Sequence, residues 1–303
     1  MFPATQLDSA ASIIGLTRKD NMNISTDWHI HSRHSCDAAS MKISDLVREA
    51  KNNGIDHFGV TDHLQTPYNL PDIVNSRQAY LSVGPGANFH FGVEVSCVSQ
   101  WELDEVATGQ YEDPIWGVRD GGPEGGQLAI GLSEDLIAQH GIEYVVGGAH
   151  WPMYVPMNRQ AVIEDYHRQN MFLATHSLVD IVAHPWWWSG HWENEDGNFD
   201  AEPWFDDFGV IPQSMHEEFR AAAIENDTAV EINISANLMN PQYPEKFAAE
   251  YLEYLVGLQG AGVCLSIGSD CHGAHYDIDF ERAGRMLEKA GIRGEFWCLS
   301  PRN

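Results

Sequence analysis

The chain has 303 residues, 43% of them hydrophobic, which is enough for a sizeable core in one or two domains. Its formal net charge of −27 repels the phosphates of DNA and RNA, so we expect no nucleic-acid partner; the excess acid predicts either a solvated surface or an attraction for cationic substrates. Five cysteines without a CxxC pair favour a reducing cytoplasm, and no apolar run approaches the roughly 18 residues of a membrane span.

Short strand-like runs alternate with helix-like segments along the chain. We predict strands at residues 26–31, 57–62, 89–95, 144–149, 179–183, 229–234 and 263–268. We predict helices at residues 43–53, 72–82, 159–176, 214–226, 244–259 and 279–290. This alternation favours seven strand–helix units, with parallel strands closed into a TIM-like α/β barrel and the helices outside. Residues 1–23 are predicted to be an N-terminal arm that is not a secretory signal, and residues 24–303 a single domain.

Three loops that follow predicted strands are enlarged. Residues 100–130 contain the glycine-rich run 121–126 and are predicted to be flexible, residues 186–212 hold five tryptophans among many acids, and residues 237–243 are rich in Pro and Asn. In a parallel barrel the loops at the C-terminal ends of the strands carry the chemistry. We therefore expect these loops to cover a functional site.

Side chains that bind divalent cations recur at the ends of the predicted strands. His29 and His31 face the same way on the first strand, and Asp270 and His272 form a second alternating pair. Taken singly, each of these residues could instead be an ordinary core, turn or surface residue that binds no metal. Six of the seven strand ends carry such a residue, however, and chance placement of 15 histidines would not sort in this way. The sequence therefore predicts two or three divalent cations, with these ligands: His29, His31, Asp37, His63, Glu94, His150, His184, Asp270 and His272.

Three further polar residues lie near the predicted ligands. Asp62 points away from His63 if its strand continues, so we expect it to support a ligand or to begin the next helix. Glu231 and Asn233 lie in a strand that looks buried. There they either orient ligands or are satisfied polar residues of the core.

As a set, these motifs resemble the PHP (polymerase and histidinol phosphatase) family. The match runs from about residue 24 to residue 290 in the same order, through HxH at His29/His31, Asp37, the TDH that ends in His63, Glu94, His150, the AHP at His184 and the closing DxH at Asp270/His272. The resemblance implies a distorted (β/α)7 barrel, a site for Zn, Mn or Fe, and the phosphoesterase activity of most characterised members. Histidinol phosphate is one substrate that it suggests.

The resemblance also divides the ligands among three metals: His29, His31, Glu94 and Asp270 at the first, Glu94, His150 and His184 at the second, and Asp37, His63 and His272 at the third. Glu94 would bridge the first two. The family often has histidine where this chain has Asp37, which adds negative charge to the third site.

The predicted activity is hydrolysis of a small phosphorylated metabolite by a metal-bound hydroxide. The catalytic candidates are Glu94, Asp270 and His34, and either His34 or a metal-bound water would protonate the leaving group.

Three residues are candidates for contact with this substrate. Arg33 and Arg159 follow ligand-bearing strands, and the guanidinium fork matches phosphate oxygens, although a surface salt bridge is the plain alternative for each. Trp186 would meet an apolar or planar part of the substrate, unless the tryptophan-rich loop packs on itself.

Two other functions compete with this prediction. An amidohydrolase-type enzyme would cleave a C–N or carboxyl ester bond with the same cations, but such proteins usually bridge their metals with a carboxylated lysine, and none of the five lysines ends a predicted strand. A non-catalytic, metal-stabilised binding module would be expected to have lost ligands, and none is lost here. The oligomeric state is left open.

Overall fold

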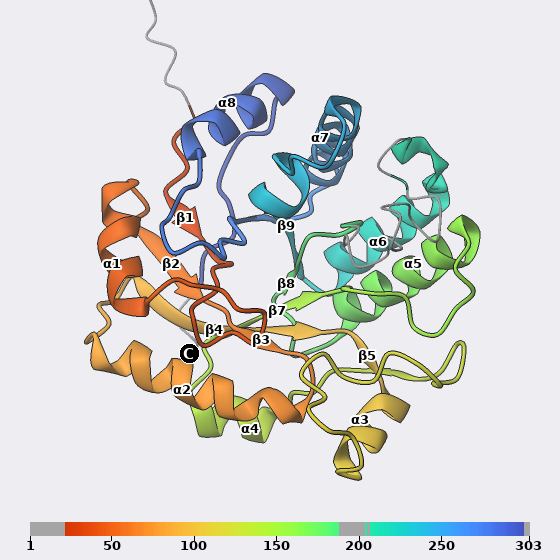
Figure 1. The fold of residues 1–303 in the computed structure, drawn as a ribbon. Helices are drawn as coiled ribbons and strands as arrows, with labels where there is room; N and C mark the ends of the chain where they lie inside the picture. The colour runs from red at the N-terminus through yellow and green to blue at the C-terminus, as the bar shows by residue number, and fades with distance from the viewer. Residues whose placement is uncertain (1–21, 188–203, 205–206, 300–303) are drawn as a thin grey trace, which may run out of the picture.

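A computed structural model describes residues 22–187, 204 and 207–299 of the chain. Seven parallel strands form a nearly closed barrel with helices around it (Figure 1), which confirms the predicted (β/α)7 architecture. The barrel strands are β1 (Thr26–Asp27), β2 (His57–Val60), β4 (Phe89–Ser96), β7 (Tyr144–Gly148), β8 (Ile181–Val182), β9 (Ala229–Asn233) and β10 (Leu265–Gly268). Met22 and Asn23 are the described part of the predicted arm, and Trp188 and Trp192 lie outside the described residues.

The strands pair in the order of the sequence, and the barrel closes where β1 meets β10. A short strand, β3 (His63–Leu64), continues β2 and also pairs with β4. β1 is shorter than predicted because the chain changes partners at this seam. The N–H of Trp28 donates to the carbonyl of Ile267 at 2.9 Å, and Ile30 forms a single parallel bridge with Cys271. The backbone of residues 28–31 is therefore held beside β10.

One helix follows each barrel strand. These helices are α1 (Ile43–Asn52), α2 (Leu70–Ser82), α4 (Glu134–His140), α5 (Arg159–Thr175), α6 (Gln213–Glu225), α7 (Glu245–Gly260) and α8 (Phe280–Ala290). Three single turns accompany them: η1 (Pro67–Asn69), η3 (Phe208–Val210) and the π-helical η4 (Ile234–Leu238). Six of the seven helices were predicted within two residues at each end, and α4 was missed.

The local sequence explains where these helices begin and end and which side of each helix packs against the barrel. Asp279 caps the N-terminus of α8, because its carboxylate accepts the N–H of Arg282 at 2.8 Å. Gly291, which has a φ of 93°, caps the C-terminus. α1 buries Ile43 and Leu46, three positions apart, against the barrel.

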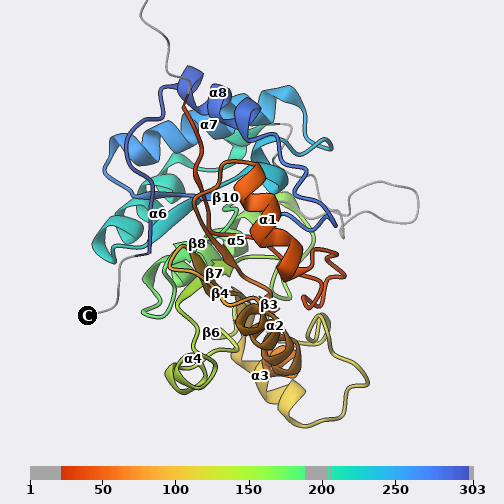
Figure 2. The ribbon, with the colours of Figure 1, turned by 90° about the vertical axis from the view of Figure 1, so that its left-hand side faces the viewer.

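The glycine-rich segment between β4 and α4 contains secondary structure of its own. It holds β5 (Val98–Ser99) paired antiparallel with β6 (Leu128–Ala129), and α3 (Gln100–Ala107), which was not predicted. Arg168 of α5 donates from Nη1 to the carbonyl of Gly126 at 2.7 Å and so ties the segment to the barrel. In Figures 1 and 2, α3 lies on the opposite side of the molecule from α7 and α8.

Aromatic side chains fill the barrel at the N-terminal ends of its strands. The ring of Tyr144 occupies the space that a Cβ would need at Gly59 of β2 and at Gly92 of β4, and its hydroxyl donates to the carbonyl of Trp28 at 2.9 Å. Trp28 and Trp297 make a T-shaped contact with ring centroids 5.1 Å apart. This end of the barrel is therefore packed core.

None of the helices in the described part of the chain combines the length and the apolar character that crossing a bilayer requires.

Candidate metal centre

The nine predicted ligands come together at the C-terminal ends of the barrel strands. Their positions follow from the parallel fold, because parallel strands all end on one side of a barrel. Glu94 lies two residues before the end of β4, His63 begins β3, and the other ligands lie beyond the ends of their strands. The pairing of β3 with β4 also places His63 directly opposite Glu94. Each of the nine has a donor atom within 3.6 Å of a donor atom of another.

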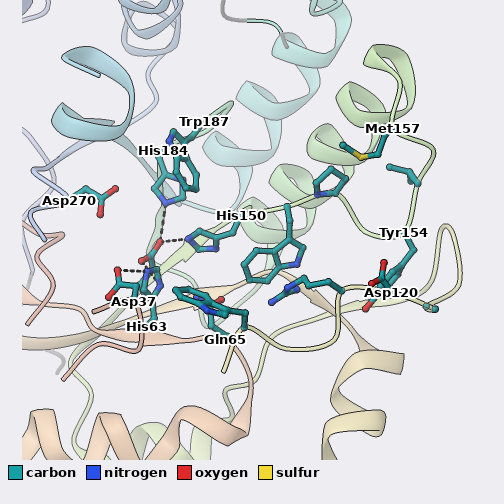
Figure 3. Close-up of a pocket in the computed structure, with 18 of the residues that line it drawn as sticks. Asp37, His63, Gln65, Asp120, His150, Tyr154, Met157, His184, Trp187 and Asp270 are labelled. Atoms are coloured by element: carbon teal, nitrogen blue, oxygen red, sulfur yellow. Dashed lines mark hydrogen bonds and ion pairs between the residues drawn. The ribbon is translucent and has the colours of Figure 1, made fainter. Parts of the chain in front are cut away.

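Glu94 lies at the centre of the cluster, and its two oxygens face different imidazoles. Oε1 lies 3.0 Å from Nε2 of both His150 and His184. Oε2 lies 3.0 Å from Nε2 of His29 and 3.3 Å from Nε2 of His31. A carboxylate placed in this way can bridge two cations. Figure 3 shows His150 and His184 both directed at this carboxylate.

A second set of donors lies beside this bridge. Oδ2 of Asp37 lies 3.4 Å from Nε2 of His63 and contacts Nε2 of His272. Asp270 lies between the two sets, with Oδ1 3.2 Å from Nε2 of His31 and 3.5 Å from Nδ1 of His272. The donor atoms that could meet at one cation form three overlapping groups: His31, Asp37, His63 and His272; His29, His31 and Glu94; and His63, Glu94 and His150. These groups share His31, His63 and Glu94 and so differ from the division that the resemblance implied.

Burial and charge act against each other within the cluster. Burial alone would raise the pKa of Glu94, but the facing imidazoles of His63 and His29 hold it well below its usual range. Burial alone would lower the pKa of His29, but Glu231 and Glu94 raise it well above its ordinary value. At His150 burial dominates and lowers the pKa to about 4. The carboxylate is therefore ionised and His150 is neutral at pH 7, the states in which both bind metal.

Three buried atoms of the cluster have no hydrogen-bond partner among the described residues: Nδ1 of His63, Nδ1 of His184 and Oε2 of Glu94. Oε2 of Glu94 is buried and accepts no hydrogen bond from the described residues, although three imidazoles surround it. A buried carboxylate oxygen without a donor is costly. Divalent cations at this point would satisfy it, and mixed imidazole and carboxylate donors suit Zn, Mn or Fe.

Buried polar residues behind the cluster hold the ligands in place. Oε1 of Glu231 lies 2.7 Å from Nδ1 of His29, and its Oε2 accepts the backbone N–H of His184 at 2.6 Å. Asn233 donates to Glu231 at 3.0 Å and to Asp270 at 3.1 Å. Both strand residues therefore orient ligands, one of the two roles that the sequence left open.

Two more contacts complete this support. The hydroxyl of Ser96 lies 2.8 Å from Nδ1 of His150. The carboxylate of Asp62 accepts the N–H of Ser32 at 2.5 Å and its hydroxyl at 2.6 Å, so it fixes the loop that follows His31. The backbone carbonyl of Asp62 accepts the N–H of the ligand Glu94 at 3.2 Å. Four ligands are thus held from behind: His29 and His150 through Nδ1, His184 through its backbone N–H, and Asp270 through its carboxylate.

Two of the ligands have an uncommon backbone conformation. φ is 28° at His184 and 55° at Asp270, in the region that residues other than glycine rarely adopt. Such conformations persist only where the surroundings enforce them, and they concentrate at functional sites.

A cavity of about 840 Å³ opens beside the cluster, and the inserted segment 98–129 supplies part of its wall. Arg33, Arg159 and Trp186, which were predicted to contact substrate, do not line it, and neither does His34, which was a candidate for protonating the leaving group. Arg33 is exposed, His34 is half-buried, and Arg159 begins α5. Trp186 is 1% exposed and packs against Trp204.

Residues that were not predicted line the cavity instead. Trp187 lines the cavity, with its ring centroid 5.1 Å from that of His184, and Figure 3 shows it beside this ligand. Arg119 is the arginine of the cavity lining, and Trp116, Trp151 and Tyr154 are further aromatic residues of the wall. No motif marks Arg119 in the sequence, whereas an acid within an apolar strand does mark Glu231.

Comparison with known proteins agrees with this geometry. The family model described as PHP domain matches residues 27–235. A protein from Listeria monocytogenes provisionally identified as a histidinol phosphatase has a similar structure, with a TM-score of 0.51, 13% identity, and coverage of 82% of this chain and 96% of that one. The likeness is one of fold.

More distant structures are also similar to this chain. A hyperthermophilic endo-β-1,4-glucanase gives a TM-score of 0.41 at 10% identity, over 88% of this chain and 98% of its own. An amidohydrolase gives a TM-score of 0.33 at 13% identity, over 89% and 71%. No curated protein matches the sequence.

Proposed function

The chain belongs to the PHP domain family, and on that premise we propose that it is a metal-dependent phosphomonoesterase that acts on a small phosphorylated molecule. The observation that carries the proposal is the position of Glu94. Oε1 of this buried carboxylate lies 3.0 Å from two imidazole nitrogens, and Oε2 lies 2.9 to 3.3 Å from three, at the wall of a cavity large enough for a metabolite.

The ligand assignment that we propose for the cations is the one that the resemblance to the family implies. Glu94 is shared by the first two, and the groups are His29, His31, Glu94 and Asp270; Glu94, His150 and His184; and Asp37, His63 and His272. Bound divalent cations supply Lewis acidity toward phosphoryl oxygens and lower the pKa of a water toward neutrality.

The protein contributes position and charge to this chemistry. Glu94 and Asp270 stay ionised because the imidazoles around them lower their pKa values, so both remain acceptors throughout turnover. Asp37, His63 and His272 line the cavity, so the third group of donors meets the substrate directly. Trp187 covers His150 and His184 from the cavity side and limits the access of water to them.

The proposed substrate is a small molecule rather than a polymer. The net charge of −27 disfavours the approach of a polyanion such as a nucleic acid. We place the phosphate of the substrate on the cation cluster, because neither Arg33 nor Arg159 lines the cavity.

The test compares bond classes on the metal-loaded protein. Purified protein loaded in turn with Zn²⁺, Mn²⁺ and Fe²⁺ is assayed against a panel of phosphomonoesters and a parallel panel of amides and carboxyl esters. We expect turnover of phosphomonoesters, reduced about 10³-fold in Glu94→Gln, which loses the bridging charge. Glu105→Gln, on α3 and outside the cavity lining, is the matched control and should leave the rate unchanged. Turnover of amides or carboxyl esters alone would overturn the phosphatase proposal in favour of the amidohydrolase type.

A further inference from the structure

The cavity extends well beyond the cation cluster, and aromatic residues form its far wall. In Figure 3, Tyr154, Asp120 and Met157 lie at the end away from His63 and Asp270. A volume of about 840 Å³ is in the range that holds a drug-sized ligand and is far larger than a phosphate group requires. This end of the cavity must therefore meet the part of the substrate that the reaction releases.

Aromatic surface begins at the ligands and continues into the cavity. The ring centroid of Trp187 lies 6.0 Å from that of His150, and the ring centroid of Trp151 lies 5.5 Å from it on another side. Trp116, which is 42% exposed, and Tyr154 line the same cavity. Flat faces of this kind bind planar rings by stacking and contribute little that is specific to a flexible alkyl chain.

Arg119 fixes one of these faces. Its guanidinium carbon lies 3.0 Å from the ring centroid of Trp151, a cation–π contact. Nη1 of Arg119 lies 3.2 Å from Oε1 of Glu102, which is fully buried and also accepts the N–H of Val118 at 2.9 Å. Burial lowers the pKa of Arg119 to about 10, so the side chain stays charged at neutral pH. Glu102 thus holds Arg119 in position, and Arg119 in turn holds the ring of Trp151.

The charges around this wall disfavour an anion. Glu102 already neutralises Arg119, and Asp120 adds a negative charge to the cavity lining. An acidic group on the leaving group would therefore meet a net negative surface, whereas a neutral or cationic ring would meet aromatic faces that accept it.

We propose that this wall selects the leaving group: it takes a planar ring without negative charge, and Arg119 is the positioning residue that holds Trp151 in place for that ring. The inference rests on the proposed function, because it assumes that the phosphoryl group is bound at the cation cluster.

Binding of phosphonates to the metal-loaded protein, measured by calorimetry, tests the proposal without turnover. Four probes separate its parts: inorganic phosphate, propylphosphonate, benzylphosphonate and para-carboxybenzylphosphonate. We expect benzylphosphonate to bind about tenfold more tightly than propylphosphonate, and the added carboxylate to remove most of that gain. Equal affinities for the benzyl and propyl compounds would overturn the inference while leaving the phosphate site intact. If inorganic phosphate and all the phosphonates fail to bind, the proposed function falls as well.

Variants assign the selectivity to the named residues. Trp151→Leu should abolish the preference for benzylphosphonate over propylphosphonate and leave the affinity for inorganic phosphate unchanged. Trp151→Phe should restore part of this preference. Arg119→Lys keeps the charge but loses the stacking, so it should weaken the preference for the ring about threefold to tenfold. A purely structural role for Arg119 would instead lower the affinities for all four probes together.

A variant of Glu102 tests whether this residue sets the preference of the cavity against anions. Glu102→Gln keeps an oxygen for the N–H of Val118 but unmasks the charge of Arg119, so para-carboxybenzylphosphonate should gain affinity relative to benzylphosphonate. Glu105→Gln, on the same helix but outside the cavity lining, is the control and should change neither ratio. A carboxylate penalty that is the same in Glu102→Gln and in the native protein would show that this pair does not set the charge preference.

Discussion

Glu231 holds His29 through a contact of 2.7 Å between Oε1 and Nδ1, on the side of the imidazole that faces away from the cation cluster. With a cation bound, this contact would keep the proton on Nδ1 and leave Nε2, which lies 3.0 Å from Glu94, to bind the cation. Because the other oxygen of Glu231 accepts the N–H of His184, one buried carboxylate orients ligands from two strands. Carboxylates behind metal-bound histidines commonly act in this way.

Glu231→Gln should therefore weaken metal binding without touching the metal. We expect affinity for the most tightly bound cation to fall about 10- to 100-fold, because the amide supports the imidazole less strongly than the carboxylate does. Titration with a metal buffer and elemental analysis measure this. Glu225→Gln, at the exposed end of α6, is the matched control. Identical affinities in the two variants would show that Glu231 only fills space.

Gly148 should tolerate no side chain, because the cluster occupies the space beside it. A Cβ at this position would lie 2.7 Å from Cε1 of His184, 2.8 Å from Cε1 of His150 and 2.9 Å from Oε1 of Glu94. We expect Gly148→Ala to lose metal and activity together, since the displaced atoms belong to three proposed ligands.

The control for this change is Gly257→Ala, within α7, where a Cβ would meet open space. That substitution should raise the free energy of unfolding by about 0.5–1 kcal/mol, as expected for alanine in a helix. Elemental analysis and thermal melts of both variants separate the effects. Full metal content in Gly148→Ala would contradict the close packing seen here.

Removal of metal should lower the melting temperature. A ligand present at 100 times its dissociation constant stabilises the folded state by about 2.7 kcal/mol, so chelation should shift the midpoint by several degrees. Calorimetric melts with and without a chelator measure the shift. Glu94→Gln should show a smaller shift, because the bridging ligand is already lost. A chelator effect of equal size in both proteins would place the stabilising metal elsewhere.

His216 should make the protein less stable in mild acid. Burial lowers its pKa to about 4, with a smaller contribution from His167, while the unfolded chain keeps a value of about 6.5. As the pH falls from about 6.5 to 4, the unfolded state gains a proton that the folded state does not bind, so stability is lost across that window. In His216→Phe, which retains a ring against Phe208, melting temperatures at pH 7 and pH 5 should differ less. An unchanged difference would refute this assignment.

The barrel and its ligands could be predicted because both follow from local periodicity. Alternation on a strand places His29 and His31 on one face, and the strand–helix repeat places their partners at the same end of the barrel. The residues predicted to contact substrate do not line the cavity because those choices depended on loops. Trp186 has a φ of 66°, and this turn leaves Trp187 rather than Trp186 in the cavity wall. No spacing in the sequence encodes that dihedral angle.

The position of Arg119 was even less predictable from the sequence. It lies in a glycine-rich segment without helical or strand periodicity, and its position depends on a partner 17 residues earlier on an unpredicted helix and on a ring that follows another strand. Such tertiary contacts leave no trace in local sequence. Glu231, by contrast, was recognisable, because an acid in an apolar strand must find a partner when it is buried.

Tyr144, Trp28 and Trp297 seal the barrel on the side away from the cations. Substrate and products therefore enter and leave through the cavity at the other end of the barrel. If the chain hydrolyses phosphomonoesters as proposed, the alcohol and the phosphate leave through the opening by which the ester enters. We then expect the released phosphate to compete with the substrate and turnover to slow as product accumulates.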